Sequence, residues 1–498
     1  MNIVMLAYAI LFFLLTSSLS SEGFPSSSWD FDYSILIDAG SSGSRMFLYK
    51  WPSKQDMNDV IRDISVARDD NGQMVVHKLS PGLSSFANEP FKLKYYIKEL
   101  IDYAINYIPE EKLPQTRLFI LATAGMRFLT DKQQENIWSE VRRLVAKFFD
   151  KLYFTKDMAK TISGFEEGLY GWITVNYLAN TLTQESDKQI GMIDLGGGSM
   201  QIAFSTKNLQ SIDNMKSIFK FNIGNNNFQV YSSTYLGYGV NSARQIYKAS
   251  LVINEKGSLL TKSMIIKDGC LHRDVVEPLM REDFEEYDSF FKTKLSSLYH
   301  DKIYILQKKI TGKNAICDYA QCGMNGAYQP ELPRGQMNYF YGLSEFWYTT
   351  KDVSKSQGYN YAKFYNDTIE YCSKNLSDVH IIAYKEMITG SIDSSGYEEI
   401  LEKKKDRCFS ASWIMVTLHE GFGFPREYSN FKPVDYINNI EVQWSLGALL
   451  VLYPRVNQKI QIAAEASELK TSRAIDFSAA IKYMFLFLAF TTAVYMSR

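Results

Sequence analysis

The chain has 498 residues, which is too long for one ordinary hydrophobic core, so the sequence predicts two domains. Hydrophobic residues make up 46% of the composition and charged residues 22%, as in a folded globular protein. Because the formal net charge is -1 and no segment forms a basic stripe, the sequence gives no reason to expect nucleic-acid binding. The basic run Lys403–Lys405 is predicted to be a solvated loop or helix face.

The N-terminal segment is apolar. Residues 3–15 form an apolar run, and a Ser-rich stretch follows around 18–21. This pattern is typical of a secretory signal, so residues 1–21 are predicted to be a signal peptide or a signal anchor. No Lys or Arg precedes the apolar run, which leaves cleavage of the segment open.

One pattern occurs twice, 156 residues apart, at 37–44 and 193–199. Each copy has an apolar run ending in an Asp, a turn of Gly with Ser, and a second apolar run, which predicts a β-hairpin with a bare tip. Such a tip lets consecutive backbone N–H groups converge on an anion, so two copies favour polyphosphate binding over two unrelated turns. We expect Asp38 and Asp194 to face one another across a cleft and to hold a hydrated divalent cation.

Strands and helices alternate along the rest of the chain. The spacing of apolar residues predicts a helix over 93–108, a buried strand over 117–122, a helix over 131–149 and a late core helix over 441–450. Alternation of this kind indicates an α/β fold. After Thr206 the sequence becomes richer in Asn, Tyr and charged residues, as expected for a second domain with insertions.

The cysteines all lie in the second half of the chain, at Cys270, Cys317, Cys322, Cys372 and Cys408. None has zinc-ribbon spacing or a neighbouring His at ligand spacing, so we expect disulfides before a metal site. Because their number is odd, at least one thiol stays free or pairs between molecules. Asn366 and Asn375 begin glycosylation sequons, which matter only if this part of the chain is lumenal.

The C-terminal segment is also apolar. Residues 479–496 form a stretch of about 18 mostly apolar residues, which is about the length that spans a bilayer. The sequence predicts a transmembrane segment, in which Lys482 reaches the interface and Arg498 stays on the cytoplasmic side. An amphipathic helix or a removed lipid-anchor signal is the alternative. With such anchors the globular part lies in the secretory lumen or outside the cell.

Five ordered segments carry a resemblance to a known family. The segments 38–45, 122–127, 164–177 and 194–201 resemble the first four apyrase conserved regions of the nucleoside triphosphate diphosphohydrolase family, and 443–448 resembles the fifth. The similarity runs from about residue 33 to about residue 455, and five motifs in order make it highly specific.

Within this family, two further segments and the apolar ends are most similar to the Golgi and lysosomal branch. These segments are 340–346 and 408–413. Members of that branch are anchored at both ends and have a lumenal catalytic domain. The resemblance therefore implies a Golgi or related endomembrane location with a lumenal catalytic domain, and a plasma-membrane enzyme that faces the outside is the alternative. The sequence leaves the oligomeric state open.

The resemblance also bears on the cysteines. It implies a disulfide between Cys372 and Cys408. A bond between Cys317 and Cys322 is plausible by spacing and leaves Cys270 unpaired. A bond between Cys270 and Cys317 is the alternative.

The family resemblance implies a two-domain architecture. The domains are expected to be ribonuclease-H-like, of the actin-like ATPase superfamily, with nucleotide in the cleft between them. Residues 31–163 plus 440–460 would form domain I, and residues 164–439 domain II. The two hairpins would be phosphate loops related by a pseudo-twofold axis.

The resemblance and the chemistry together predict the residues that bind substrate and metal. Asp38 and Asp194 would hold Ca²⁺ or Mg²⁺ mainly through its water shell. Thr123 and the backbone of Ala124 would contact phosphate, while Arg45 either pairs with phosphate or only supports its loop. The remaining predicted phosphate contacts are in the two loops, at Gly40, Ser41, Ser42, Gly43, Ser44, Gly196, Gly197 and Gly198.

Hydrolysis of a terminal phosphoryl group also needs a placed water and a base. The family pattern puts the base at Glu167, with Glu166 as the competitor and an exposed helix-start pair as the non-catalytic alternative. By resemblance, Ser199 and Gln201 help to position the water. Tyr348 would stack on the nucleobase, unless it belongs to a buried strand or helix. Trp172 and Trp444 are expected to be core aromatics.

These expectations lead to a functional hypothesis. We expect a membrane-anchored lumenal nucleotidase that cleaves nucleoside di- and triphosphates, with UDP or GDP left by glycosyltransferases as its natural substrates. A cell-surface apyrase acting on extracellular ATP and ADP is the first alternative. A kinase or exopolyphosphatase of the same superfold is the second alternative, and the secretory signal and the segment Glu166–Gly168 argue against it. A catalytically dead nucleotide receptor is the third, and the intact Asp38, Asp194 and Glu167 argue against it.

Overall fold

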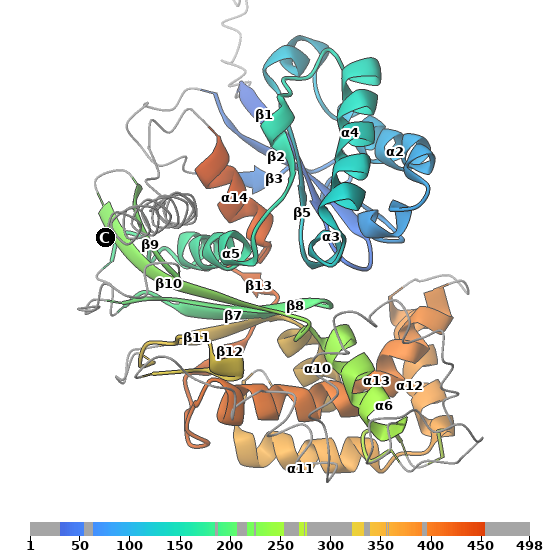
Figure 1. Cartoon of the computed structure of the whole chain (residues 1–498), viewed down its shortest axis with the longest axis vertical. Coiled ribbons are helices and arrows are strands. Elements are labelled where there is room, and N and C mark those ends of the chain that lie inside the picture. The colour runs from blue at the N-terminus through green and yellow to red at the C-terminus, as the bar shows by residue number, and fades with distance from the viewer. Residues whose placement is uncertain are drawn as a thin grey trace, which may run out of the picture.

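The computed structural model describes residues 30–53, 63–184, 188–206, 217–223, 226–252, 268–272, 274–275, 321–332, 339–354, 356, 358–390 and 396–453. Two six-stranded sheets, covered by helices, make up the described structure (Figure 1). The predicted α/β class is confirmed. The predicted signal segment at 1–21 and the predicted transmembrane segment at 479–496 lie outside these ranges, within which none of the helices has the length and apolar character that a bilayer span requires.

The first sheet is built around the first hairpin. Strand β1 pairs antiparallel with β2 and parallel with β5, and the strand order is β3-β2-β1-β5-β6 with β4 on β2. The first predicted hairpin and the predicted strand over 117–122 are therefore confirmed. The strands are β1 (Phe31–Ala39), β2 (Ser44–Pro52), β3 (Ser65–Val66), β4 (Val76–Leu79), β5 (Arg117–Ala122) and β6 (Ala159–Thr161).

The second sheet repeats this arrangement around the second hairpin. Strand β7 pairs antiparallel with β8 and parallel with β11, and the order is β12-β11-β7-β8-β10-β9. A central strand with a hairpin partner on one side and parallel strands on the other thus occurs in both sheets. The strands are β7 (Gly191–Leu195), β8 (Ser199–Ser205), β9 (Ile218–Ile223), β10 (Asn226–Leu236), β11 (Phe340–Ser344) and β12 (Phe431–Pro433).

The helices form three layers around the two sheets (Figure 1). Helices α2 and α4 pack on the outer face of the first sheet, and α6, α10, α11 and α13 cover the outer face of the second. Helices α5 and α14 lie between the sheets and share one core with both. The helices are α2 (Leu93–Ile105), α3 (Ala124–Arg127), α4 (Asp131–Phe148), α5 (Gly164–Leu178), α6 (Val240–Val252), α10 (Glu345–Val353), α11 (Tyr361–Cys372), α12 (Leu376–Thr389), α13 (Tyr397–Val416) and α14 (Trp444–Leu452).

The side chains of β1 show why both faces of a sheet are covered. Ile35 and Ile37 pack in the outer cluster with α2, whereas Leu36 packs in the inner cluster with α5 and α14. Successive side chains of a strand point to opposite faces, so a strand that is apolar at every position must be buried on both sides.

The two inner helices approach one another closely. A Cβ atom at Gly447 of α14 would overlap the backbone oxygen of Tyr170 in α5. The Gly447 N–H donates a hydrogen bond of 2.8 Å to Thr174 Oγ1. Glycine is therefore required where these two helices cross.

The predicted helices over 93–108 and 131–149 are confirmed as α2 and α4. The late core helix begins at Trp444, so the predicted start at residue 441 was wrong. Ile440 and Glu441 instead form strand β14, which pairs with β13 (Tyr436–Ile437), and Gln443 is extended as the N-cap residue.

The basic run Lys403–Lys405 lies on α13. Lys403 pairs with Glu399 on an exposed surface, as expected for a solvated helix face. Lys404 is an exception because it is only 2% exposed and its Nζ lies 2.7 Å from Asp352 Oδ1. A charged side chain can be buried where it is paired in this way.

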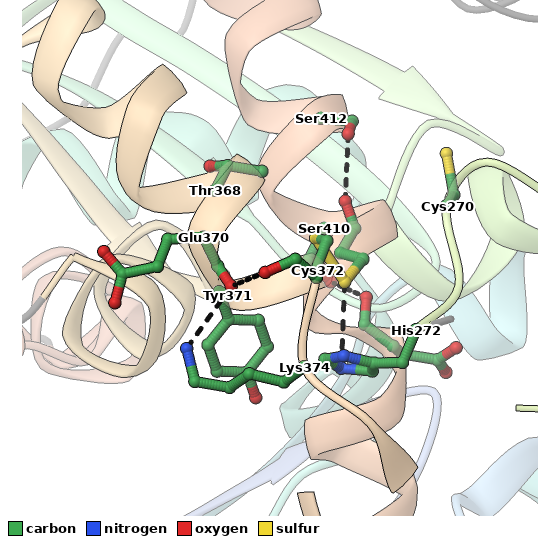
Figure 2. The surroundings of a disulfide bond; sticks show 12 residues. Cys270, His272, Thr368, Glu370, Tyr371, Cys372, Lys374, Ser410 and Ser412 are labelled. Atoms are coloured by element: carbon green, nitrogen blue, oxygen red, sulfur yellow. Dashed lines mark hydrogen bonds between the residues drawn. A yellow bond between two sulfur atoms is a disulfide. The ribbon is translucent and has the colours of Figure 1, made fainter. Parts of the chain in front are cut away.

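The disulfide between Cys372 and Cys408 joins α11 to α13 (Figure 2). This bond confirms the pairing that the resemblance implies. Cys270 is a buried free thiol, so the alternative bond between Cys270 and Cys317 was wrong. Cys322 is disulfide-bonded, and its expected partner Cys317 lies outside the described residues.

Candidate active site

The two glycine-rich loops meet one another. A Cβ atom at Gly197 would lie 3.0 Å from Ser41 Oγ, and one at Gly198 would lie 2.9 Å from the Cβ of Ala124. The Ala124 Cβ cannot rotate away, so its contact favours glycine at position 198. The two loops and the first residue of α3 thus lie together, although their sequence segments are far apart. The Thr123 N–H donates to Ala39 O over 3.2 Å, which ties the start of α3 to the end of β1.

The first loop is packed tightly from behind. A Cβ atom at Gly43 would lie 2.7 Å from Leu79 O, and one at Gly82 would overlap the backbone oxygen of Ser41. The loop is therefore held against the segment that follows β4. A loop supported in this way can bind an anion without first being ordered.

The two hairpins place equivalent residues at equivalent positions. Asp38 pairs with Arg45 in the first hairpin, and Asp194 pairs with Gln201 in the second. Each Asp is the penultimate residue of its central strand. The predicted symmetry of the two hairpins therefore extends to the residues opposite each Asp.

Both aspartates carry a buried oxygen without a partner. Asp38 Oδ1 and Asp194 Oδ1 accept no hydrogen bond from any of the residues that the structure describes. Burial raises the pKa of Asp38 to about 7, against the opposing effect of Arg45. Burial also raises the pKa of Asp194, against a hydrogen bond from the Ser344 side chain. Unpaired carboxylate oxygens are costly in a protein interior unless a cation or a proton compensates them.

This arrangement fits a hydrated divalent cation. In the described ranges no group of three or more His, Cys, Asp or Glu side chains converges as a complete metal site. Mg²⁺ needs no such cage, because it usually keeps several waters and binds through one or two carboxylates together with substrate phosphates. The orphaned oxygens of Asp38 and Asp194 provide that limited set of protein ligands.

The start of α5 separates the roles of its two glutamates. Glu166 Oε2 accepts hydrogen bonds from the Ser163 N–H over 2.8 Å and from the Ser163 hydroxyl over 2.9 Å. The Ser163 Oγ in turn accepts from the Glu166 N–H over 3.1 Å, which completes a capping box. Glu166 is thus engaged in capping the helix, whereas Glu167 is 8% exposed and faces other partners.

Glu167 is held through one of its two oxygens. Its Oε2 accepts a hydrogen bond from Arg127 Nη2 and another, of 3.1 Å, from Gln201 Nε2. Among the described residues, none donates a hydrogen bond to Oε1. Burial raises the pKa of Glu167 to about 7, and the Asp194 charge adds to the rise while Arg127 opposes it. A carboxylate fixed at one oxygen, with a pKa near neutrality, suits general base catalysis.

Arg127 is a site residue that sequence reasoning missed. It ends α3, and its Nη2 also donates to Ser199 Oγ over 3.1 Å. Gln201 Nε2 donates to the same Ser199 Oγ over 2.7 Å. The only sequence signal was that Arg127 closes the conserved segment 122–127. Its partners became known only from the fold.

Two further residues form side-chain hydrogen bonds with the aspartates. Trp444 is 6% exposed within the inner core, as expected, but a hydrogen bond from its side chain also lowers the pKa of Asp38. Ser344, which acts on Asp194, has φ 56° and ψ -116°, a conformation that L residues rarely adopt. Trp172 is fully buried and packs against Phe228, so it is a core aromatic as predicted.

Arg45 is engaged within the protein. Its Nη1 lies 3.1 Å from Glu441 Oε1, and the two side chains are 26% and 13% exposed. This ion pair joins β2 to β14. The Glu441 carboxylate compensates the charge of Arg45, so a phosphate is not needed for that purpose. Of the two roles considered for Arg45, the structure therefore favours support of the first loop.

Tyr348 lies on α10, one turn after Ser344, and is 37% exposed. It is therefore neither in a strand nor fully buried. Burial raises the pKa of its phenol to about 12, and the Asp435 charge adds to the rise while Arg45 opposes it. An exposed ring on a helix that starts beside Asp194 can contact a bound nucleotide.

Comparison with known proteins identifies the family. The profile of the GDA1/CD39 (nucleoside phosphatase) family matches residues 26–465, which is most of the chain. The chain belongs to this family. The enzyme class predicted from five conserved segments is therefore confirmed, and GDA1/CD39 proteins are generally dependent on divalent cations.

Similar proteins include named members of the GDA1/CD39 family. Ectonucleoside triphosphate diphosphohydrolase 7 of Xenopus tropicalis is 33% identical over 84% of this chain and 73% of its own length. Human ectonucleoside triphosphate diphosphohydrolase 4 is 33% identical over 84% and 72%. The nucleoside-diphosphatase mig-23 of Caenorhabditis elegans is 30% identical over 84% and 76%.

A solved structure has a similar fold. The crystal structure of a nucleoside triphosphate hydrolase from Neospora caninum aligns with a TM-score of 0.54 over 86% of this chain and 93% of that chain. The sequence identity is 13%, so the similarity is one of fold.

Proposed function

We propose that this GDA1/CD39 protein hydrolyses nucleoside di- and triphosphates to the monophosphate and phosphate with Ca²⁺ or Mg²⁺, and that UDP- and GDP-type diphosphates are favoured. The nucleotide would bind between two ribonuclease-H-like domains of the actin-like ATPase type, at 31–163 plus 440–460 and at 164–439. The observation that carries the proposal is the placement of Glu167. It is fixed through Oε2 near two aspartates, and none of the described residues donates a hydrogen bond to the buried Oδ1 of either aspartate.

The chemistry follows from these positions. The backbone N–H groups of both loops would bind the non-bridging phosphate oxygens. A bound divalent cation would neutralise charge on those oxygens. Ser199 and Gln201 would hold a water in line with the terminal phosphorus, and Glu167 Oε1 would take its proton as the water oxygen bonds to phosphorus. The bond to the bridging oxygen then breaks, and that oxygen leaves with the nucleoside phosphate. A triphosphate requires two rounds.

We place this activity in the lumen of the Golgi or a related endomembrane, where it would clear nucleoside diphosphates left by glycosyltransferases. The name nucleoside-diphosphatase of one relative supports a diphosphate as the substrate. Asn366 and Asn375 are exposed, as lumenal glycosylation sites must be. A cell-surface apyrase is the second candidate, because two relatives are named ectonucleoside triphosphate diphosphohydrolases.

Two experiments test these proposals. The full-length protein is incubated with ADP, UDP, GDP and the matching triphosphates in Ca²⁺ or Mg²⁺, and released phosphate is measured. Release without an acceptor excludes a kinase, and faster release from UDP or GDP than from ADP supports the lumenal role. Microscopy of a tagged protein then separates the Golgi from the plasma membrane.

A further inference from the structure

Arg127 bridges two parts of the site with one nitrogen. Its Nη2 donates both to Glu167 Oε2 at the start of α5 and to Ser199 Oγ after the second loop. The arginine and glutamate side chains are only 13% and 10% exposed. Because Arg127 ends the short helix α3, it also connects these groups to Thr123 and Ala124, where that helix begins.

The position of this guanidinium is costly for the folded protein. The N-terminus of a helix favours negative charge, yet Arg127 lies against the first residue of α5, where a Cβ atom at Gly164 would overlap Nη1. Arg127 Nε is also buried, and within the described ranges it has no acceptor. A buried ion pair gives little stability compared with apolar packing of the same volume. Stability alone therefore does not explain an arginine here.

The hydrogen bonds of Arg127 and Gln201 determine how Ser199 and Glu167 are oriented. A hydroxyl oxygen has two acceptor sites and one proton. Arg127 Nη2 and Gln201 Nε2 both donate to Ser199 Oγ, so its two acceptor sites are filled and its proton must point elsewhere. The same two nitrogens both donate to Glu167 Oε2, which leaves Oε1 as the free acceptor. One donor, Ser199, and one acceptor, Glu167, are thereby fixed at the same time.

We infer that Arg127 is a positioning residue that orients Glu167 Oε1 and the Ser199 hydroxyl onto one attacking water. This inference rests on the proposed hydrolysis. It assigns the Nη2 group of Arg127 to the water and not to the phosphate, because both protons of that nitrogen are used within the protein. Loss of Arg127 should therefore lower kcat and leave nucleotide affinity nearly unchanged.

The test compares wild-type protein with Arg127→Ala and Arg127→Lys. We expect Arg127→Ala to lower kcat about 100-fold with KM changed by less than about threefold, which is the scale of a misplaced general base. Arg127→Lys, which keeps the charge but not the fork geometry, should have intermediate kcat. Millimolar guanidinium should partly restore Arg127→Ala, because it can occupy the space left by the side chain.

Arg142→Ala is the matched control. Arg142 is also an arginine near the first sheet, and its side chain is 20% exposed. None of the described residues accepts a hydrogen bond from its buried Nε. It should show normal kcat and no response to guanidinium. A rise in KM with kcat retained in Arg127→Ala would assign Arg127 to phosphate binding and overturn the inference. Loss of kcat without guanidinium rescue in a variant that melts like wild type would also overturn it. Absence of phosphate release by wild-type protein would instead refute the proposed function.

Discussion

Gln201 Nε2 donates a hydrogen bond of 3.1 Å to Glu167 Oε2. This contact joins the strand after the second loop to the helix between the two sheets. Gln201 also occupies the position opposite Asp194 that Arg45 occupies opposite Asp38. The two hairpins are thus equivalent in backbone, but the residue at this position serves the base in one and an ion pair with Glu441 in the other.

Replacement of Glu167 by Gln should abolish the base and keep the shape of the site. We expect turnover to fall about 100- to 10,000-fold, because an amide cannot accept the proton of water. Protection of the protein by nucleotide against heat should persist. Phosphate release and thermal unfolding with and without nucleotide measure the two effects.

Glu166→Gln is the control for this variant. Gln serves in a capping box as well as Glu does, so both stability and turnover should stay close to wild type. The base assignment is wrong if Glu166→Gln loses turnover while Glu167→Gln retains it.

The raised pKa of Glu167 predicts how stability depends on pH without divalent cations. The folded protein holds the Glu167 proton up to about pH 7, whereas the unfolded chain releases it near the usual value of 4.5. Between these values the folded state binds more protons than the unfolded state. The contribution of Glu167 to the free energy of unfolding is therefore fully present below the lower value and is lost as pH rises through the higher one. Asp38, whose pKa is also raised to about 7, should act in the same direction.

The measurement is the midpoint of thermal unfolding in EDTA at a series of pH values. The midpoint should decline from about pH 4.5 to about pH 7 through this contribution, and the decline should be shallower in Glu167→Gln. Equal slopes in the two proteins would contradict a raised pKa for the buried Glu167 carboxyl group.

Asp194→Asn should weaken cation binding. With a non-hydrolysable nucleoside diphosphate present, Ca²⁺ or Mg²⁺ should raise the unfolding temperature of wild-type protein, because ligands that bind the folded state stabilise it. The variant should lose most of this rise. Asp102→Asn, an exposed position paired with Lys98, should keep it. An unchanged response in Asp194→Asn would remove this residue from the cation site.

Tyr348→Ala should weaken binding of the nucleobase. A stacking contact worth roughly 1 kcal/mol or more predicts a KM about five- to tenfold higher, with kcat nearly unchanged. Tyr348→Phe keeps the ring and should be close to wild type. Tyr384→Ala, at another exposed tyrosine on α12, is the control. If Tyr348→Ala has a normal KM for all the nucleotides tested, the ring does not contact the base.

Gly447→Ala tests the contact between α5 and α14. The added methyl group would overlap the backbone oxygen of Tyr170, so the helices must separate, at a cost of roughly 1–3 kcal/mol. Chemical denaturation measures this loss. Gly358→Ala is the control, since nothing lies within 4 Å of its Cβ position, and its change should stay within about 0.5 kcal/mol. Equal stability of the two variants would contradict the close crossing.

The local elements of this protein could be predicted from its amino-acid sequence. Alternating and helical spacings located β5, α2 and α4, and the repeated Asp with a Gly and Ser turn located both hairpins. These features depend on neighbours a few residues apart, so composition and period are enough to predict them. The family could also be predicted from the sequence, because five segments in order resemble its conserved regions.

Which side chain contacts which partner could not be predicted from the sequence and depends on the fold. Glu166 and Glu167 are adjacent in sequence, but one caps α5 and the other meets Arg127 and Gln201, which come from different elements. The buried Lys404 forms an ion pair with Asp352, a residue of another helix. Such pairings depend on contacts between distant segments and on burial, and no local period encodes them.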